Sequence, residues 1–282
     1  MLKILHASDL QVGKPFRARA GEAFIQLAFD IKPHFIVVSG DLTQRAKRTE
    51  FRAAWDLLKR LPTVPLVVTP GNHDVPLFRF WERVLFPYWH WNRQIPRDRD
   101  SVAQVAGSVI VGLDSASPLR AIVNGRISRG QLAFARKQFE RAPRGAVRVL
   151  VIHHHFVRPP GGEGGAPLPG AQGILRQVED MGVDLVLGGH VHASNVATSR
   201  DLIPGEGTGV PLITAGTTTS RRGRGEERRR NSANLVHVFD DRVDVIPHFF
   251  ESRGAGFEPG PSTSVARSGA SAPVPPLGGG RG

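Results

Sequence analysis

One feature constrains the fold of this chain more than any other. Five short apolar segments are each followed directly by polar residues that can bind a metal. The segments are rich in Val, Ile and Leu, which predicts buried β-strands. In open α/β sheets, ligands bind at the carboxyl ends of the strands, so we expect the residues after these segments to converge at one edge of one sheet. The segments span residues 2–5, 35–38, 66–68, 147–152 and 185–187.

The polar residues after the five segments form a ligand set that suits two metal ions. Imidazole and carboxylate together favour zinc, iron and manganese, and the lack of cysteine excludes thiolate sites. A carboxylate that bridges two ions holds them roughly 3.5–4 Å apart, and such a pair lowers the pKa of bound water enough to give hydroxide near neutral pH. These residues are Asp9, Gln11, Asp41, Asn72, His73, Asp74, His153, His154, His155, His190 and His192.

Strands and helices alternate in the first part of the chain, which predicts an α/β fold. Helices are expected at residues 16–29, 51–61 and 174–181, and a capping box of Ser128 and Gln131 predicts another that runs to Phe139. The later strands lie close together in the sequence and indicate a second, more mixed sheet. These further strands span residues 108–113, 212–214, 235–239 and 242–246, the last two forming a hairpin.

The chain is expected to form one folded domain over residues 1–251. Residues 252–282 are rich in Gly, Pro and Ser and predict a disordered tail. No apolar run approaches the ~18 residues of a membrane span, and the N-terminus lacks the long apolar segment of a signal peptide. We therefore expect a soluble, cytoplasmic protein with no membrane span.

The formal net charge of +12 suits an anionic partner. A phosphoester substrate is the partner that the predicted metal site favours. Nucleic acid is a partner that the charge allows but that we do not favour. The abundance of arginine could instead reflect only the coding composition of the source genome.

The order of the strand-end motifs resembles the signature of the calcineurin-like metallophosphoesterases, a family that includes the class III cyclic-nucleotide phosphodiesterases. The resemblance covers about residues 1–215. It implies an α/β fold in four layers, an α/β/β/α sandwich of two mixed β-sheets flanked by helices. The motifs that carry it are Asp9-x-Gln11, Gly40-Asp41, Gly71-Asn72-His73-Asp74, His153 and Gly189-His190-x-His192.

The resemblance also implies a role for each residue at the predicted site. Two divalent ions, manganese, iron or zinc, would be bridged by Asp41. One ion would be completed by Asp9, Gln11 and His192, and the other by Asn72, His153 and His190. His73 would face the substrate phosphate and protonate the leaving oxygen, with Asp74 orienting it from behind.

Gln11 departs from the family pattern, which usually has His at this position. An amide oxygen is a poorer ligand for zinc or iron, so Gln11 either coordinates weakly or leaves its ion under-coordinated. We expect the first site to bind metal more weakly than the second. The choice of His153 over its neighbours rests on its place directly after the apolar segment.

Three groups near the predicted site keep two interpretations each. His154 and His155 would either support the ligands or face the substrate. The arginine-rich residues 221–230, beginning with Arg221 and Arg222, would either clamp phosphate or form a solvated loop. The aromatic residues after His73 would either stack on nucleobases or, as we favour, pack on the core; they are Phe78, Phe80, Trp81, Phe86, Tyr88, Trp89 and Trp91.

The predicted function is metal-dependent phosphoester hydrolysis, with a small phosphodiester such as a cyclic nucleotide as substrate. One alternative is a DNA-repair exonuclease of the same superfamily, which the opening residues 4–10 and the positive charge would suit. Hydrolysis of a lipid-linked pyrophosphate would need an apolar groove that the sequence does not reveal. A different class is a metal-binding scaffold with weak or no activity, which only Gln11 supports.

Overall fold

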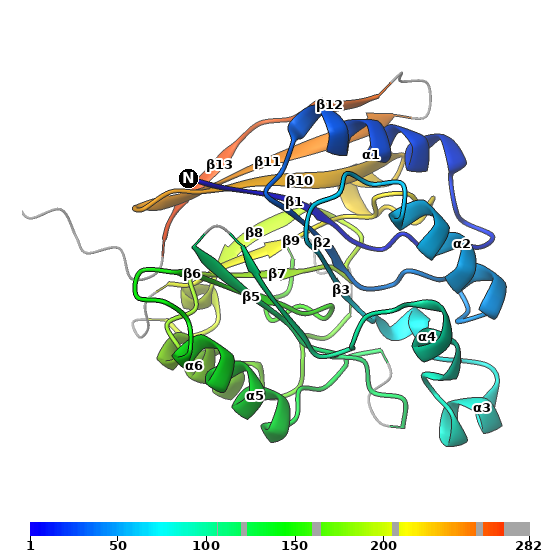
Figure 1. The fold of residues 1–282 in the computed structure, drawn as a ribbon, viewed down its shortest axis with the longest axis horizontal. Helices are drawn as coiled ribbons and strands as arrows, with labels where there is room; N and C mark the ends of the chain where they lie inside the picture. Colours follow the sequence, from blue (N-terminus) through cyan, green and yellow to red (C-terminus); the bar gives the residue numbers. More distant parts are fainter. Residues whose placement is uncertain (106, 120–122, 160–164, 205–208, 252–255, 268–282) are drawn as a thin grey trace, which may run out of the picture.

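The computed structural model describes residues 1–105, 107–119, 123–159, 165–204, 209–251 and 256–267. Two mixed β-sheets lie face to face in its centre (Figure 1). The first has the order β12-β11-β10-β1-β2-β3, with β13 also paired to β11. Its strands are β1 (Leu2–Ala7), β2 (Phe35–Ser39), β3 (Leu66–Thr69), β10 (Arg230–Val238), β11 (Arg242–Glu251), β12 (Phe257–Pro259) and β13 (Thr263–Ala266).

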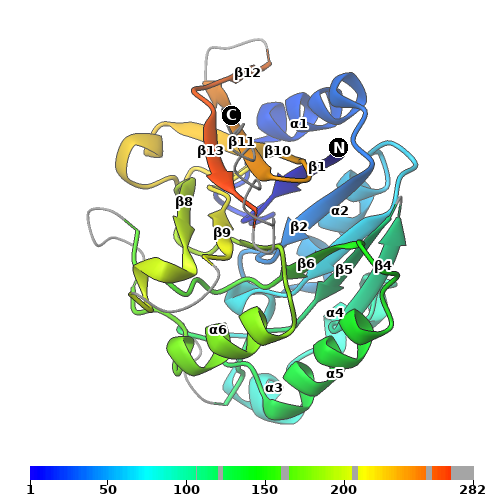
Figure 2. The same ribbon diagram turned by 90° about the vertical axis from the view of Figure 1, so that its left-hand side faces the viewer.

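The second sheet has the order β4-β5-β6-β7-β9-β8, with parallel strands in the middle and an antiparallel strand at each edge. Four helices flank the sheets, α1 and α2 beside the first and α5 and α6 beside the second (Figure 2). The strands are β4 (Ser101–Val105), β5 (Ser108–Gly112), β6 (Val147–Val151), β7 (Leu185–Gly188), β8 (Asn195–Thr198) and β9 (Pro211–Thr214). The helices are α1 (Ala18–Ile31), α2 (Arg48–Leu58), α3 (Phe80–Leu85), α4 (Trp89–Gln94), α5 (Arg129–Glu140) and α6 (Ala171–Asp180).

The alternation of side chains along each strand explains the four layers. On β1, Leu5 and Ala7 join the apolar cluster under α1 and α2, whereas Leu2 and Ile4 join the cluster between the two sheets. A third cluster lies between the second sheet and the helices α5 and α6. Because both faces of the central strands are buried, their sequences are apolar throughout. The predicted α/β/β/α sandwich is confirmed.

The predicted placement of the C-terminal hairpin was wrong. Strands β10 and β11 form the expected hairpin, but β10 pairs antiparallel with β1, with Leu235 opposite Leu5, and so belongs to the first sheet. Strand β10 is buried along almost its whole length. It covers the edge of β1 that would otherwise expose a row of unpaired backbone groups.

The predicted disordered tail also begins too early. Strands β12 and β13 both pair with β11, and Phe257 packs edge-on against Phe24 of α1. Low apolar content concealed these strands, because their stability comes from backbone pairing and from one buried ring. The rest of the predicted tail, residues 252–255 and 268–282, lies outside the described residues.

The stability of the fold depends on the ionisation of Asp114, which lies just after β5. Its carboxylate is buried and paired with Arg99 at 2.8 Å, yet burial outweighs the ion pair and raises its pKa to about 6. A carboxyl group with a raised folded-state pKa favours the folded state below its unfolded pKa of about 4, and this contribution is lost as the pH rises through 6.

We therefore expect wild type to gain up to about 3 kcal/mol of unfolding free energy over Asp114→Asn as the pH falls from 7 to 4. Urea unfolding of both proteins across this range measures the difference. A constant difference would show that Asp114 titrates normally.

Candidate metal centre

The five predicted strand ends do meet, but they come from both sheets rather than one. Strands β1, β2 and β3 contribute from the first sheet, and β6 and β7 from the second. Hydrogen bonds join the two sheets at this edge: His153 Nδ1 donates to the Ser39 carbonyl at 2.7 Å, and the His190 backbone N–H donates to Asp9 Oδ2 at 2.9 Å. Face-to-face packing of the sheets aligns the strand ends, which a single-sheet interpretation missed.

The backbone is in the left-handed region at most of these positions. Seven non-glycine residues in the described chain have positive φ, and five of them were predicted metal ligands, with φ between 46° and 77°. This conformation is unfavourable for residues with a Cβ and occurs mainly at functional sites. The five are Asp9, Gln11, Asp41, His190 and His192.

Glycine at position 71 is required by the close approach of two loops. A Cβ added to Gly71 would overlap the Asp41 carboxylate and also meet the Asp41 backbone nitrogen at 2.5 Å. The turn after β3 can therefore lie against the turn after β2 only without a side chain at this position.

His192 and Asp9 point their lone pairs at one another. His192 Nδ1 lies 2.9 Å from the Arg222 carbonyl and must carry the proton that it donates there. Its Nε2 is then an acceptor, 3.1 Å from Asp9 Oδ1, and both side chains are buried. Two facing acceptors in a buried site repel each other unless a cation or a proton lies between them.

His153 shows the same arrangement on the other side of the site. Donation from Nδ1 to Ser39 leaves Nε2 as an acceptor, which faces Asn72 Oδ1 at 3.3 Å and Asp41 Oδ1 at 3.5 Å. His190 Nδ1 lies 2.9 Å from the same Asn72 oxygen. Burial and the neighbouring histidines hold the pKa of His190 well below its usual value, so its ring is neutral and can ligate a metal.

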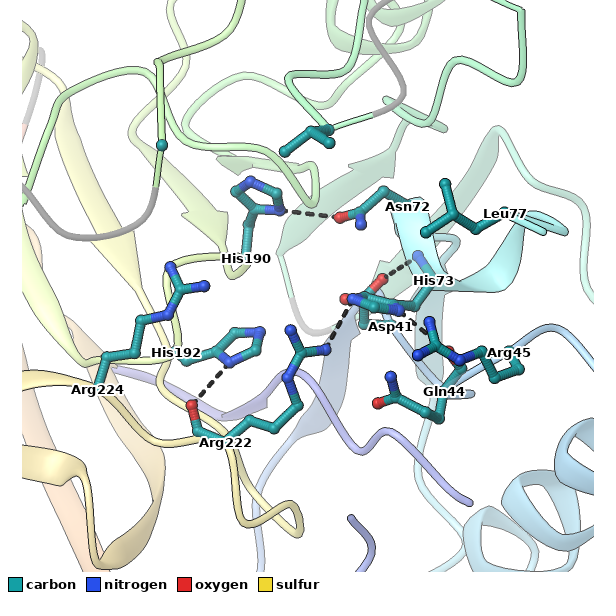
Figure 3. Close-up of a pocket in the computed structure, with 12 residues that line it drawn as sticks. Asp41, Gln44, Arg45, Asn72, His73, Leu77, His190, His192, Arg222 and Arg224 are labelled. Carbon is teal, nitrogen blue, oxygen red and sulfur yellow. Dashed lines mark hydrogen bonds between the residues drawn. The ribbon is translucent and has the colours of Figure 1, made fainter. Parts of the chain in front are cut away.

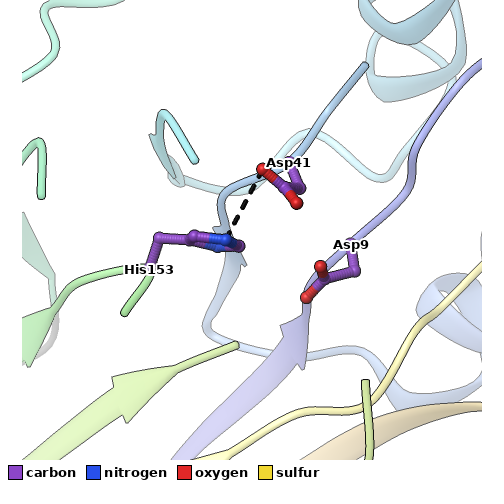
Figure 4. A group of neighbouring side chains, drawn as sticks. All are labelled: Asp9, Asp41 and His153. Atoms are coloured by element: carbon purple, nitrogen blue, oxygen red, sulfur yellow. Dashed lines mark ion pairs between the residues drawn. The ribbon is translucent and has the colours of Figure 1, made fainter. Parts of the chain in front are cut away.

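Asp41 lies between these two groups. It faces His153 on one side and accepts from Gln11 Nε2 at 3.3 Å on the other. Asp9, Asp41 and His153 each offer a ligand atom within 4.8 Å of the others (Figure 4). The donor types, their burial and the carbonyls that fix the imidazole tautomers all fit divalent cations.

Gln11 does not present its oxygen to this cluster. Its Oε1 accepts from Ser220 Oγ at 2.9 Å, and its Nε2 faces Asp41 Oδ2 and, at 3.2 Å, His192 Nε2. An amide nitrogen is a donor and cannot ligate a cation. In this orientation Gln11 supports the Asp41 carboxylate, and Asp9 and His192 remain as the candidate ligands of the first group, the one on the Gln11 side of Asp41.

Replacing Gln11 by His should therefore raise the metal occupancy of the site beside Asp9 and His192, because an imidazole adds a ligand where the amide adds none. Metal counting by mass spectrometry after dialysis against limiting manganese measures this, with Ser220→Ala as a variant that frees the amide without adding an imidazole. Equal occupancy and activity in wild type and Gln11→His would argue against a ligand position at residue 11.

His73 faces the open side of the cluster, but Asp74 does not orient it. His73 Nδ1 donates to the Gln44 carbonyl at 3.0 Å, and Nε2 points toward the cavity, where it accepts from Arg222. The Asp74 carboxylate instead accepts backbone N–H groups of Leu42, Thr43 and Gly71 at 2.9–3.0 Å. The predicted role of Asp74 was wrong: it holds together the turns after β2 and β3, and a backbone carbonyl positions His73.

A cavity of about 530 Å³ opens beside these residues (Figure 3). Arg222 lies across it, with Nη1 2.8 Å from His73 Nε2, and Arg45 and Arg224 also line it. Arg221, which was predicted to act with Arg222, is exposed and lines a separate hollow beside Phe16. The two residues lie in a turn directly after Ser220, and only Arg222 reaches the cavity.

His154 and His155 do not appear among the described residues that line this cavity. His154 Nδ1 pairs with Ser115 Oγ at 2.8 Å, and the His155 ring stacks on His190 with centroids 5.5 Å apart. Burial lowers the pKa of His155 to about 4, so its ring is neutral. The structure places both residues behind a ligand rather than toward a substrate.

A polar run that was not predicted supports the segment that contains Asp9 and Gln11. Residues 217–220 are buried and follow β9. Thr217 Oγ1 donates to the Asp9 carbonyl at 2.8 Å, Thr219 Oγ1 donates to the Leu10 carbonyl at 2.7 Å, and Ser220 holds Gln11. A run of four hydroxyl residues, three positions after an apolar strand, is the signal that could have revealed them.

The sequence matches a known family of enzymes. The family model described as calcineurin-like phosphoesterase matches residues 2–194, well over half of the chain. The chain belongs to this family. This family of phosphoester hydrolases, together with the Asp9–Asp41–His153 group, confirms the prediction of a divalent-metal cofactor. The search of curated proteins found no match.

Several solved structures share the fold of this phosphoesterase. A dimetal phosphatase from Danio rerio has a TM-score of 0.62 at 12% identity, covering 95% of this chain and 99% of the other. A purple acid phosphatase from yellow lupin has a TM-score of 0.60 at 12% identity, covering 94% and 53%. GAP50, the anchor in the inner membrane complex of Plasmodium, has a TM-score of 0.57 at 14% identity, covering 94% and 89%. At these identities the likeness shows the fold alone. Within the described residues, no helix is long and apolar enough to cross a bilayer.

Proposed function

We propose that this chain is a phosphodiesterase that hydrolyses a small phosphodiester, such as a cyclic nucleotide. The observation that carries the proposal is the position of His73: its Nε2 faces the cavity directly beside the buried cluster around Asp41. The Danio rerio and lupin structures are described as phosphatases, so the choice of a diester rests on this chain's own residues.

Asp9, Asp41, Asn72, His153, His190 and His192 would hold two divalent ions. When bound, such ions neutralise the phosphoryl oxygens and lower the pKa of an attacking water. In the structure Nδ1 donates to the Gln44 carbonyl and Nε2 accepts from Arg222. To act as the acid, His73 must carry a second proton on Nε2, and Arg222 must turn from Nε2 to the phosphoryl oxygens. Nε2 then gives its proton to the leaving oxygen. A diester loses an alkoxide or a ribose oxygen, and such leaving groups depend strongly on a proton donor.

Arg222 binds the phosphoryl oxygens that face away from the cluster. Its guanidinium is half-buried, lies 2.8 Å from His73, and presents a planar set of donors to the cavity. Arg45 and Arg224 extend the positive wall, which attracts an anionic substrate. A cavity of about 530 Å³ accommodates a nucleotide-sized ligand.

Turnover of bis-p-nitrophenyl phosphate and p-nitrophenyl phosphate, each with manganese, zinc or iron, tests the proposal directly. We expect higher kcat/KM for the diester, and hydrolysis of at least one cyclic nucleotide in a panel. Activity on the monoester alone would contradict a phosphodiesterase. Bound metal without turnover of any phosphoester would favour the scaffold alternative.

The pair Arg221 and Arg222 offers a matched test of substrate binding. Arg222→Gln removes a charge-assisted contact to the phosphoryl group, and we expect KM to rise at least about tenfold, from the ~1.5–3 kcal/mol of such a contact. Arg221→Gln removes the same charge outside the cavity and should leave KM within about twofold. Steady-state kinetics on the diester measures both, and an equal rise in KM for the two variants would assign the effect to net charge.

A further inference from the structure

An exposed aromatic surface lies on the segment that contains α3 and α4. Both helices are labelled in Figure 1. Eleven large apolar side chains are exposed among the described residues, and six of them fall within residues 78–89. Scattered exposed side chains need no explanation, but a cluster in one short segment marks a binding surface. We call these six the aromatic surface: Phe78, Phe80, Trp81, Leu85, Phe86 and Trp89.

The side chains of the aromatic surface do not pack against the hydrophobic core. Helix α3 has no buried residue, and Trp81 is 72% exposed. The predicted packing of the aromatic cluster on the core holds for Trp91, which is buried against Phe51, and for half-buried Tyr88. It was wrong for the other five aromatic residues. Four of these contact one another in pairs, Phe80 with Trp81 and Phe86 with Trp89, with ring centroids 5.2 and 5.7 Å apart.

Hydrogen bonds from two arginines link this segment to the loop after β2 and to the cavity wall. Arg79 donates to the carbonyls of Arg45 and Ala46, both at 2.9 Å. Arg83 donates to the Leu77 carbonyl at 2.7 Å, and Leu77 itself lines the cavity. The aromatic surface therefore adjoins the cavity, since exposed Phe78 directly follows Leu77.

Positive charge is interleaved with the aromatic rings. Residues 77–97 contain four arginines and one glutamate, a net charge of +3. The Arg93 guanidinium lies 3.3 Å from the centre of the Trp89 ring, and those of Arg83 and Arg45 lie over Phe80 and Phe78. Trp, Phe and Leu beside arginine is the composition of segments that lie in the interface of anionic bilayers.

A nucleic-acid strand suits this surface less well than a bilayer. Base stacking needs free ring faces in parallel array, whereas Phe80 and Trp81 are nearly perpendicular, at 74°, and guanidinium groups cover one face of three rings. Insertion among lipid headgroups needs only apolar edges with cations beside them, which this segment provides.

We propose that the aromatic surface docks this protein on an anionic lipid bilayer, with the apolar side chains among the headgroups and Arg93 beside lipid phosphates. The mouth of the cavity then lies next to the bilayer surface. Docking does not require catalysis, so the proposal stands or falls separately from the phosphodiesterase assignment.

Co-sedimentation with vesicles tests the proposal. We expect wild type to bind vesicles of equal parts phosphatidylglycerol and phosphatidylcholine, and to bind pure phosphatidylcholine more weakly. The double variant Trp81→Ser and Phe86→Ser should lose at least about tenfold in partition coefficient, the loss expected from two apolar contacts. Arg93→Gln should lose about fivefold on anionic vesicles only.

Phe29→Ser is the matched control, because Phe29 is 50% exposed on α1, away from the aromatic surface. It should bind vesicles as wild type does. The altered side chains are exposed, so Tm should not change. In wild type, lipids brominated on their acyl chains should quench tryptophan fluorescence, which tests insertion without any variant.

Three results would overturn the proposal: no binding of wild type to anionic vesicles, equal binding by the double variant, or no quenching. Binding of a single-stranded oligonucleotide, or dimerisation, that depends on Trp81 and Phe86 in place of vesicle binding would also overturn it, and would assign the surface to that partner.

Discussion

Replacement of Asp41 by Asn should abolish most of the activity and most of the metal binding together. Asp41 lies between the two proposed ligand groups, because its ligand atom is within 4.8 Å of those of Asp9 and His153. Its Oδ1 also accepts the backbone N–H of His73 at 2.8 Å. An amide at this position keeps the shape but removes the charge. With several kcal/mol of transition-state stabilisation lost, turnover of bis-p-nitrophenyl phosphate should fall by about a thousandfold or more.

Mass-spectrometric metal counting and steady-state kinetics on the same preparation check this result. Asp114→Asn provides the control, because it alters another buried aspartate that lies outside the site. It should keep its metal and its activity. Full metal content together with full turnover in Asp41→Asn would remove Asp41 from the mechanism.

Replacement of His73 by Asn should lower kcat while leaving the metal content unchanged. His73 contacts no predicted ligand through its ring, since Nδ1 bonds Gln44 and Nε2 faces the cavity beside Arg222. Loss of a general acid lowers rates by about 10²–10⁴-fold. The effect should be largest for a cyclic nucleotide, whose ribose oxygen needs a proton, and smallest for bis-p-nitrophenyl phosphate, whose leaving group does not.

This dependence on the leaving group separates acid catalysis from mere damage to the site. A structural defect would slow both substrates by the same factor, and that outcome would contradict a proton-transfer role. His237→Gln is the control, because His237 pairs with Lys3 near the start of β1, at the opposite end of that strand from Asp9. It should leave both rates unchanged.

The site could be predicted from the sequence because the proposed ligands occupy equivalent positions, each just after the end of a strand. Asp9, Asp41, Asn72, His153 and His190 each follow a short apolar strand, and that local pattern is visible without any structure. The strand ends were expected on one sheet because the pattern says nothing about which strands pair. Pairing of β10 with β1 depends on residues more than 200 positions apart.

Side-chain contacts to backbone carbonyls could not be predicted from the sequence. The Gln44, Ser39 and Arg222 carbonyls fix the tautomers of His73, His153 and His192, and a carbonyl group carries no residue identity. The separation of Arg221 from Arg222 has a related cause, since the direction of each side chain is set by loop conformation. Neither feature has a signature in residue type.

Anomalous X-ray diffraction from crystals grown with manganese is the measurement that addresses the central claim most directly. Two ligand groups that share Asp41 should give two peaks roughly 3.5–4 Å apart, one beside Asp9 and His192 and the other beside Asn72, His153 and His190. Removal of metal by a chelator should abolish turnover, and manganese should restore it. Peaks elsewhere in the molecule, or none at Asp41 in an active preparation, would contradict a metal centre built from these strand ends.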